Sequence, residues 1–136
     1  MDDITATLHV SAAGMRAQGT RLRVIAENIA NADSEATAPG QEPYRRRVVT
    51  FRDALDRESG GETVRVRDID EDPTPFPKRW DPGHPAADPS GYVLESNVNP
   101  LIEMTDMQEA QRSYEANLNV VRATKGMAQD VIDVLR

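Results

Sequence analysis

The chain has 136 residues, a formal net charge of -7 at pH 7 and no cysteine. An acidic chain disfavours nonspecific binding to nucleic acid or anionic lipid, and the lack of cysteine excludes disulfides, thiolate metal sites and thiol nucleophiles. The length suits one ordinary domain, but aromatic residues make up only 4% of the chain, so the material for a compact aromatic core is thin.

The first ten residues, MDDITATLHV, are acidic where a secretory signal has a basic segment. No run of 18 apolar residues occurs anywhere in the chain. We therefore expect a soluble protein that is not membrane-embedded and that carries no ordinary cleaved export signal.

An N-terminal helix is predicted from about residue 4 to residue 29, a stretch without proline. Apolar residues recur there every seven positions, at Leu8, Met15, Leu22 and Ile29. Small residues between them weaken an isolated helix but let another backbone approach closely. The helix is therefore predicted to form contacts and not to stand alone.

The end of this helix, AENIANAD, carries Asn28 and Asn31, two residues that are poor helix formers in helix interiors. Their spacing of three places both amides on one helix face if the helix continues through them. Local chemistry alone equally favours Asn31 as a C-terminal cap. The sequence leaves these two alternatives open.

The middle of the chain predicts a small β-rich module near residues 44 to 95. A polar loop covers residues 33–43 and is followed by two β-compatible runs, YRRRVVTF and ETVRVRDI, the second preceded by the turn signal Ser59-Gly60-Gly61. Six prolines between Pro73 and Pro89 exclude a central strand or a helix there. GYVLE, residues 91–95, is the last candidate strand.

The C-terminal helix has the clearest signal in the sequence. Asn99 suits the N-cap, Pro100 the first helical position and Glu103 the first turn. A stripe at spacings of three and four residues follows and contains two polar residues, Gln111 and Lys125, in equivalent heptad positions that tend to fix register and partner choice. The stripe consists of Met104, Met107, Gln111, Tyr114, Leu118, Val121, Lys125, Ala128, Ile132 and Leu135.

The predicted helices are too long for a compact domain of this size. Some 37 helical residues span about 55 Å, whereas a compact chain of this length has a diameter on the order of 37 Å. We therefore predict an α+β fold in which two long terminal helices pack together, coiled-coil-like and extended, with the β-rich module between them. The predicted segments are 1–32, 33–98 and 99–136.

Candidate enzymatic or metal-binding residues are few. His84 lies near Asp81 and Asp88 in WDPGHPAADP, which could hold a metal or perform acid–base chemistry, but a shaped proline-rich loop explains them more simply. The acidic run DIDEDP lacks the glycine and the distant glutamate of an EF-hand loop. No nucleophile or nucleotide motif is present, so we expect no enzyme, no cofactor, no metal and no small-molecule substrate. A monomeric helical adaptor is a further alternative.

Three arginines, Arg45, Arg46 and Arg47, stand beside Tyr44 and could grip a phosphate. The chain is acidic and has no second basic cluster. Charge pairing with neighbouring acidic strands or with another subunit is therefore the preferred interpretation.

Three blocks of the sequence resemble bacterial flagellar basal-body rod proteins, and together they cover nearly the whole chain. SAAGMRAQGTRLRVIAENIANAD resembles the N-terminal signature of flagellar axial proteins, and EMTDMQEAQRSYEANLNVVRATKGM resembles their C-terminal signature. EPYRRRVVTF, followed by WDPGHPAADPSGYVLESNVNP, resembles the middle segment of the proximal rod type. Between these blocks, residues 53 to 77 show only generic similarity.

The resemblance implies a structural subunit that polymerises through its terminal helices into the rod, the drive shaft that crosses the periplasm and transmits motor torque for swimming. It implies export through the flagellar type III apparatus without signal cleavage, and partners among other rod proteins, copies of the same chain and neighbouring basal-body components. It also implies terminal segments that tend to order only on assembly.

Two sets of residues are predicted to matter for assembly. The helix-packing set consists of Leu8, Met15, Leu22, Ile29, Met104, Met107, Tyr114, Leu118, Val121, Ile132 and Leu135. The resemblance adds a signature set of Asn28, Asn31, Arg112, Glu115 and Asn117. The amides of Asn28 and Asn31 are expected to bond to the backbone or to a neighbouring subunit.

Overall fold

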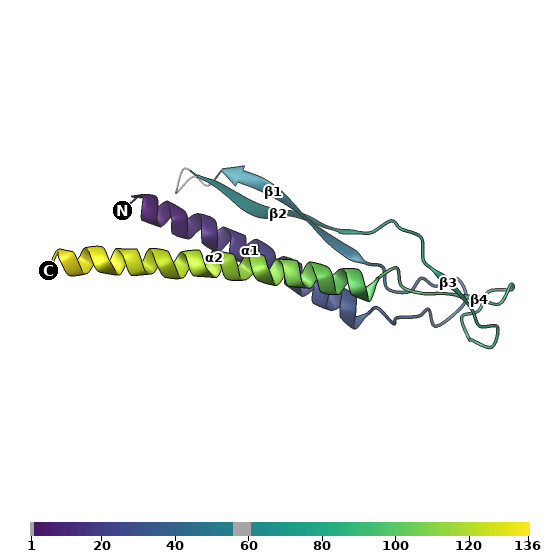
Figure 1. Cartoon of the computed structure of the whole chain (residues 1–136). Coiled ribbons are helices and arrows are strands. Elements are labelled where there is room, and N and C mark those ends of the chain that lie inside the picture. Colours follow the sequence, from purple (N-terminus) through teal and green to yellow (C-terminus); the bar gives the residue numbers. More distant parts are fainter. Residues whose placement is uncertain (1, 56–60) are drawn as a thin grey trace. The chain divides into compact units, whose positions relative to one another are not determined.

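The structure is a computed structural model that describes residues 2–55 and 61–136. In chain order its elements are α1 (Asp2–Ala30), β1 (Arg47–Leu55), β2 (Glu62–Glu71), β3 (Lys78–Trp80), β4 (Tyr92–Leu94) and α2 (Pro100–Val134) (Figure 1). Two long helices with small antiparallel sheets between them confirm the predicted α+β class. The predicted turn at Ser59-Gly60-Gly61 lies mostly outside the described residues.

The start of α2 follows the predicted capping pattern. The Asn99 Oδ1 atom accepts a hydrogen bond from the backbone N–H of Leu101 at 3.1 Å, and the Asn99 carbonyl accepts one from the N–H of Glu103 at 3.1 Å. Pro100 occupies the first helical position, where its missing N–H costs no intrahelical bond. The prediction of Asn99 as N-cap is confirmed.

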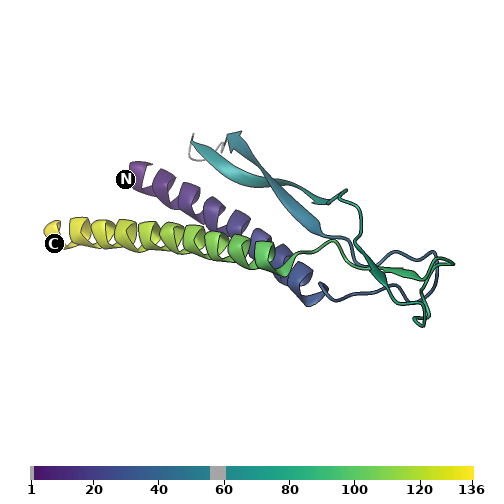
Figure 2. The same cartoon turned by 45° about the vertical axis from the view of Figure 1, so that its right-hand side comes forward.

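The strands form two separate two-stranded sheets, one of β1 and β2 and the other of β3 and β4 (Figure 2). In the second sheet Lys78 pairs with Leu94 and Trp80 with Tyr92, in antiparallel register. β3 was not predicted, because it lies within the proline-rich stretch. Its three residues fall between prolines, so they can form an edge strand without losing a ladder bond.

Gly91, just before β4, has a φ of +86°, a conformation that other residues rarely adopt. A Cβ atom at this position would lie 3.1 Å from the Trp80 Nε1 atom. Glycine thus allows both the backbone turn and the close approach of the Trp80 ring.

The contacts divide the chain into two compact units, each built from separate stretches. The first unit contains Met1–Leu22, Val49–Asp68 and Gln108–Arg136, and the second contains Arg23–Val48 and Ile69–Met107. Each unit thus takes pieces from more than one of the segments predicted as 1–32, 33–98 and 99–136. That division stays a prediction.

In the first unit the two helices approach each other closely in antiparallel order. A Cβ atom on Gly14 would lie only 2.8 Å from the Asn117 Nδ2 atom, and Arg21 forms an ion pair with Glu109 at 3.7 Å. Glycine is therefore required at this crossing unless the Asn117 side chain moves. In the second unit a small apolar cluster consists of Ala36, Ala86 and Val93.

The buried face of α2 matches the predicted stripe only in part: Met107, Tyr114, Leu118 and Val121 are partly buried. Ala110 and Thr124 are buried, whereas Gln111 and Lys125, the two polar residues of the stripe, are exposed. Gln111 and Lys125 are thus not packed within the single chain, and their effect on register and partner choice stays a prediction. Short side chains at Ala110 and Thr124 permit close packing, and the long polar ones reach water. Among the described residues, neither helix is long and apolar enough to cross a membrane.

Candidate assembly site

Asn28, near the end of α1, is the centre of a buried hydrogen-bond network in the second unit. Its side chain is 1% exposed. The Nδ2 atom donates to the Arg47 carbonyl at 2.8 Å and to Glu103 Oε2 at 3.2 Å. The Oδ1 atom accepts from the Arg47 N–H at 3.0 Å and from the Tyr44 hydroxyl at 2.7 Å. All four hydrogen-bonding positions of the amide are thus used.

Glu103, in the first turn of α2, is the largest fully buried side chain among the described residues, with 0% exposed. Its Oε1 atom accepts a hydrogen bond from Arg46 Nε, in an ion pair, while Oε2 accepts from Asn28. A buried carboxylate needs such partners, because an unpaired buried charge is strongly destabilising. The pair therefore fixes the start of α2 to the strand that begins at Arg47.

Arg46 also forms ion pairs with Asp72 at 3.2 Å and with Asp106 at 3.4 Å. Burial alone would lower the pKa of Arg46, but the hydrogen bonds and charges of Glu103 and Asp72 outweigh burial and raise that pKa above its ordinary value. Hydrogen bonds from Thr74 to Asp72, and the Arg46 charge, hold the pKa of Asp72 below its ordinary value. Arg46 thus stays charged at any physiological pH.

The two neighbouring arginines are paired as well. Arg47 forms an ion pair with Glu27 at 3.4 Å. The Arg45 guanidinium lies 4.1 Å from the centroid of the Phe76 ring and donates to the carbonyl of Asp72 at 2.9 Å. The prediction that the arginine run pairs with acidic residues of the fold is confirmed.

Asn31 lies in the turn after α1 and caps the helix through its side chain. The Asn31 Nδ2 atom donates to the Glu27 carbonyl at 2.8 Å, and the Asn31 backbone N–H donates to the same carbonyl at 3.1 Å. No non-glycine residue among those described has a positive φ, so Asn31 does not take the left-handed cap conformation. The two asparagines therefore have different roles: Asn28 is a buried connector and Asn31 a terminal cap.

Three further signature residues lie on α2, in the first unit. The Asn117 Nδ2 atom donates to the Ser113 carbonyl at 3.0 Å and faces Gly14. Arg112 and Glu115 are exposed, and neither side chain has a hydrogen-bond or ion-pair partner among the described residues. Both are available to another chain.

The predicted packing set is distributed unevenly between interior and surface. Met104, Ile132 and Leu135 are exposed by 52%, 48% and 80%. The others are partly buried: Leu8, Met15, Leu22, Ile29, Met107, Tyr114, Leu118 and Val121. A single chain does not show contacts between subunits, so an assembly role for these side chains stays a prediction.

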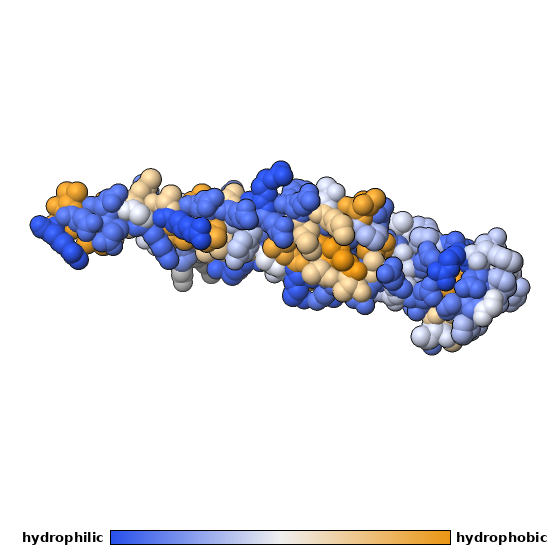
Figure 3. Space-filling model, turned by 60° about the horizontal axis from the view of Figure 1, so that its bottom comes forward, coloured by the Kyte–Doolittle hydropathy of each residue, from blue (hydrophilic) through white to orange (hydrophobic). Residues whose placement is uncertain are grey.

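Exposed hydrophobic residues concentrate at the two ends of α2. At its start Leu101 is 74% exposed, and over residues 129–136 every residue is exposed. Figure 3 shows a small group of hydrophobic residues among hydrophilic ones at the C-terminal end, and a broader hydrophobic area to the right of the middle of the view. Contiguous exposed apolar surface of this kind typically marks an interaction site. The apolar residues in the last eight positions are Val131, Ile132, Val134 and Leu135.

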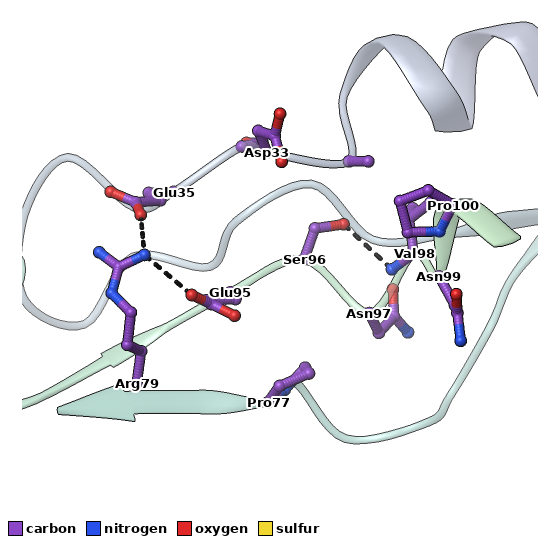
Figure 4. A pocket seen from close by; sticks show the side chains of 12 residues that line it. Asp33, Glu35, Pro77, Arg79, Glu95, Ser96, Asn97, Val98, Asn99 and Pro100 are labelled. Atoms are coloured by element: carbon purple, nitrogen blue, oxygen red, sulfur yellow. Dashed lines mark hydrogen bonds and ion pairs between the residues drawn. The ribbon is translucent and has the colours of Figure 1, made fainter.

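A cavity of about 600 Å³ in the second unit lies between the loop after α1 and the residues that lead into α2. Arg79 bridges two carboxylates on its wall, Glu35 at 2.6 Å and Glu95 at 2.8 Å (Figure 4). The hydrogen bonds from Arg79 and from His84 hold the pKa of Glu35 below its ordinary value. The bridge ties the loop after α1 to Arg79 of strand β3 and to the residue that follows strand β4.

His84, Asp81 and Asp88, the residues of the alternative metal site, each have a hydrogen-bond or ion-pair partner within the chain. The His84 Nδ1 atom accepts from the Ala86 N–H at 3.0 Å, so its Nε2 carries the proton that is donated to Glu35 at 2.7 Å. Asp81 pairs with Arg79 at 3.5 Å, and Asp88 accepts from the Tyr92 N–H at 2.9 Å. No group of three possible metal ligands occurs in residues 2–55 and 61–136.

Sequence reasoning missed Glu103 and Tyr44 as members of the site. Glu103 was interpreted only as a first-turn anion of α2, and Tyr44 only as a neighbour of the arginines. Their partner Asn28 lies 75 and 16 residues away along the chain. A pattern in the local sequence cannot predict contacts between residues so far apart. The one available signal was the apparently misplaced Asn28 itself.

Two long helices that leave apolar side chains exposed in the single chain are typical of a structural subunit that assembles with other chains. The comparisons with known proteins agree with this class. The family model for the flagellar basal body rod FlgEFG protein C-terminal region matches residues 90–134.

Three curated relatives extend the match to nearly the whole chain, and each is named flagellar basal-body rod protein FlgC. That of Agrobacterium fabrum is 48% identical over 100% of this chain and 98% of its own length. That of Yersinia enterocolitica is 42% identical over 87% of each chain, and that of Bacillus subtilis 37% identical over 94% and 95%. The chain belongs to the FlgC family of flagellar basal-body rod proteins. The predictions of a structural rod subunit and of the flagellar basal body as its location are thereby confirmed.

Proposed function

We propose that the chain polymerises through α1 and α2 with other rod proteins and with copies of itself. The observation that carries the proposal is the exposed apolar surface of α2, where all of residues 129–136 lack cover in the single chain. Burial of such surface between subunits supplies about 25 cal/mol per Å². The assembled rod then transmits torque from the motor to the rest of the flagellum.

The buried network around Asn28 supports the mechanical part of this proposal. It joins the end of α1, the start of β1 and the start of α2 through hydrogen bonds and an ion pair. A torque-bearing subunit needs such fixed connections between its helices and the module they carry. The network holds these three elements together inside the second unit.

We further propose that the subunit leaves the cytoplasm through the flagellar type III export apparatus without cleavage and works in the periplasm. The membership of the chain in the FlgC family of basal-body rod proteins supports this route. The exposed end of α2 then becomes ordered on assembly, at a cost of about 1–2 kcal/mol of backbone entropy per residue. Circular dichroism of the free chain tests the last point: we expect helicity below that of the assembled form, and a fully helical monomer would favour the adaptor alternative.

The direct test removes the gene and supplies the chain from a plasmid. We expect motility to return and the chain to be present, at its full length, in purified basal bodies. Basal bodies with complete rods that lack the chain would contradict the proposal. The metal-enzyme alternative makes the opposite prediction for His84→Ala: bound metal in the purified wild type, and loss of function with assembly intact.

A further inference from the structure

The net charge is distributed very unequally between the two units. The first unit contains ten Lys and Arg against eleven Asp and Glu, a net charge of about -1, whereas the second contains six against twelve, about -6. Because each unit is assembled from separate stretches of the chain, the order of the sequence does not show this difference in charge. The second unit is thus the acidic part of the molecule.

A groove in the first unit lies between α1 and β2 and has a volume of about 280 Å³. Two buried small residues of α1, Ala13 and Ala17, form part of its wall. Because they carry only a methyl group, a backbone can approach the helix closely there. The groove is lined by Ala13, Arg16, Ala17, Thr20, Val64, Arg65 and Val66.

Two arginines, Arg16 from α1 and Arg65 from β2, line this groove. Both are exposed, and neither guanidinium has a hydrogen-bond or ion-pair partner among the described residues. By contrast, Arg46, Arg47 and Arg79 of the second unit are all paired with carboxylates. The groove therefore presents two unused fork-shaped donors that match carboxylate geometry.

The β2 strand supplies a second element of recognition. Its sheet has only two strands, so β2 pairs with β1 on one side and has no strand partner on the other among the described residues. A free edge beside a groove is the arrangement that accepts an extended segment through main-chain hydrogen bonds. The free edge of β2 favours an extended segment, and the two arginines favour a segment that carries carboxylates.

We propose that this groove binds an acidic segment from the second unit of another copy of the chain. The charge complementarity between a groove with two free arginines and a unit of net charge about -6 is the argument for a second copy. Asp33, in the turn after α1, offers one contact for these arginines, because its carboxylate is exposed and has no partner among the described residues. This inference rests on the proposed polymerisation and names the surfaces through which two copies meet.

Charge reversal in the groove tests the proposal, with a matched control on the same hairpin. Arg65→Glu or Arg16→Glu, as the only copy in the cell, should reduce incorporation into basal bodies at least tenfold. Arg52→Glu makes the same charge change on β1, outside the groove lining, and should leave incorporation within twofold of the wild type. Equal incorporation of the Arg65→Glu and wild-type chains would overturn the proposal.

The lack of cysteine in the chain allows a second, direct measurement. Cells that produce both a Thr20→Cys chain and an Ala32→Cys chain, which keep the two groove arginines and Asp33, should yield, after oxidation, a disulfide-linked pair of the two in basal bodies. Recovery of both chains in basal bodies without this linked pair would overturn the assignment of the partner. The two proposals can be told apart. If the proposed polymerisation is wrong, the wild-type chain itself is absent from basal bodies. If only the groove proposal is wrong, the charge-reversed chain enters basal bodies normally.

Discussion

The side-chain amide of Asn28 bonds to both the N–H and the C=O of Arg47, at 3.0 and 2.8 Å. The Asn28 side chain thus makes the two backbone hydrogen bonds with Arg47, the first residue of β1, that a neighbouring strand would otherwise make. The remaining two positions of the amide bind Tyr44 and Glu103. A residue of α1 thereby fixes the start of β1 beside the end of this helix.

Replacement of Asn28 by alanine should therefore destabilise the second unit strongly. Several polar groups would lose their buried partner, and each such group costs about 1–3 kcal/mol, so we expect a loss on the order of 2–4 kcal/mol. Urea denaturation followed by the fluorescence of Trp80, the single tryptophan, measures it. Asn31→Ala is the matched control: its amide is at the surface, and its loss should cost less than about 1 kcal/mol. A similar cost for both variants would contradict the role of Asn28.

Breaking the Arg46–Glu103 pair should be costly from either side. Glu103→Ala leaves Arg46 without its most buried partner, and Arg46→Ala leaves a carboxylate uncompensated inside the fold, so each change should cost about 3 kcal/mol. Since both residues act in one contact, the double variant should cost clearly less than the two single effects added together. A double-mutant cycle by denaturation checks this. Strict additivity would show that the pair is not coupled.

The Glu35–Arg79 bridge predicts a specific loss of stability in acid. Hydrogen bonds from Arg79 and His84 hold the folded-state pKa of Glu35 below its ordinary value of 4.5. A lowered carboxyl pKa gives stability that is fully present above about pH 4.5 and is lost as the pH falls through the folded-state value. Glu35→Gln should therefore reduce stability at pH 7, and the reduction should shrink as the pH falls below 4.5 and through the folded-state pKa of Glu35. A reduction that stays constant as the pH is lowered would contradict the prediction.

Gly14 and Gly19 provide a matched pair for the helix crossing in the first unit. Gly19 has no atom within 4 Å of an added Cβ, so Gly19→Ala should stabilise the helix by about 0.5–1 kcal/mol. An added Cβ on Gly14 meets Asn117 at 2.8 Å, so Gly14→Val should instead lower the melting temperature. Thermal denaturation followed by circular dichroism compares them. A stabilising Gly14→Val change would contradict the close approach of α1 to Asn117.

The helices and the main strands could be predicted because their signals are local. The spacing of Leu8, Met15 and Leu22 indicates α1, and Asn99 followed by Pro100 marks the start of α2. The strand β3 was missed because prolines on both sides hide a three-residue pairing. These differences follow from contacts between distant parts of the chain, which override local preference.

The candidate site was predictable only in outline. Asn28 was recognised as unusual for a helix interior, but its partners lie 19 and 75 residues away. Glu103 was missed for the same reason: it is charged, yet it is buried because Arg46 and Asn28 pair with it. A hydrophobic pattern places such a residue on the surface.

Incorporation of charged helix variants into basal bodies tests the central claim, that α1 and α2 are the surfaces of polymerisation. Leu22→Asp and Leu118→Asp place an unpaired charge on the partly buried helix faces, whereas Gln108→Asp changes an exposed position of α2 and is the control. With each variant as the only copy, we predict that both leucine variants are absent from purified basal bodies and that the cells do not swim, while the Gln108→Asp cells swim normally. Normal amounts of either leucine variant in basal bodies, with full motility, would contradict the account.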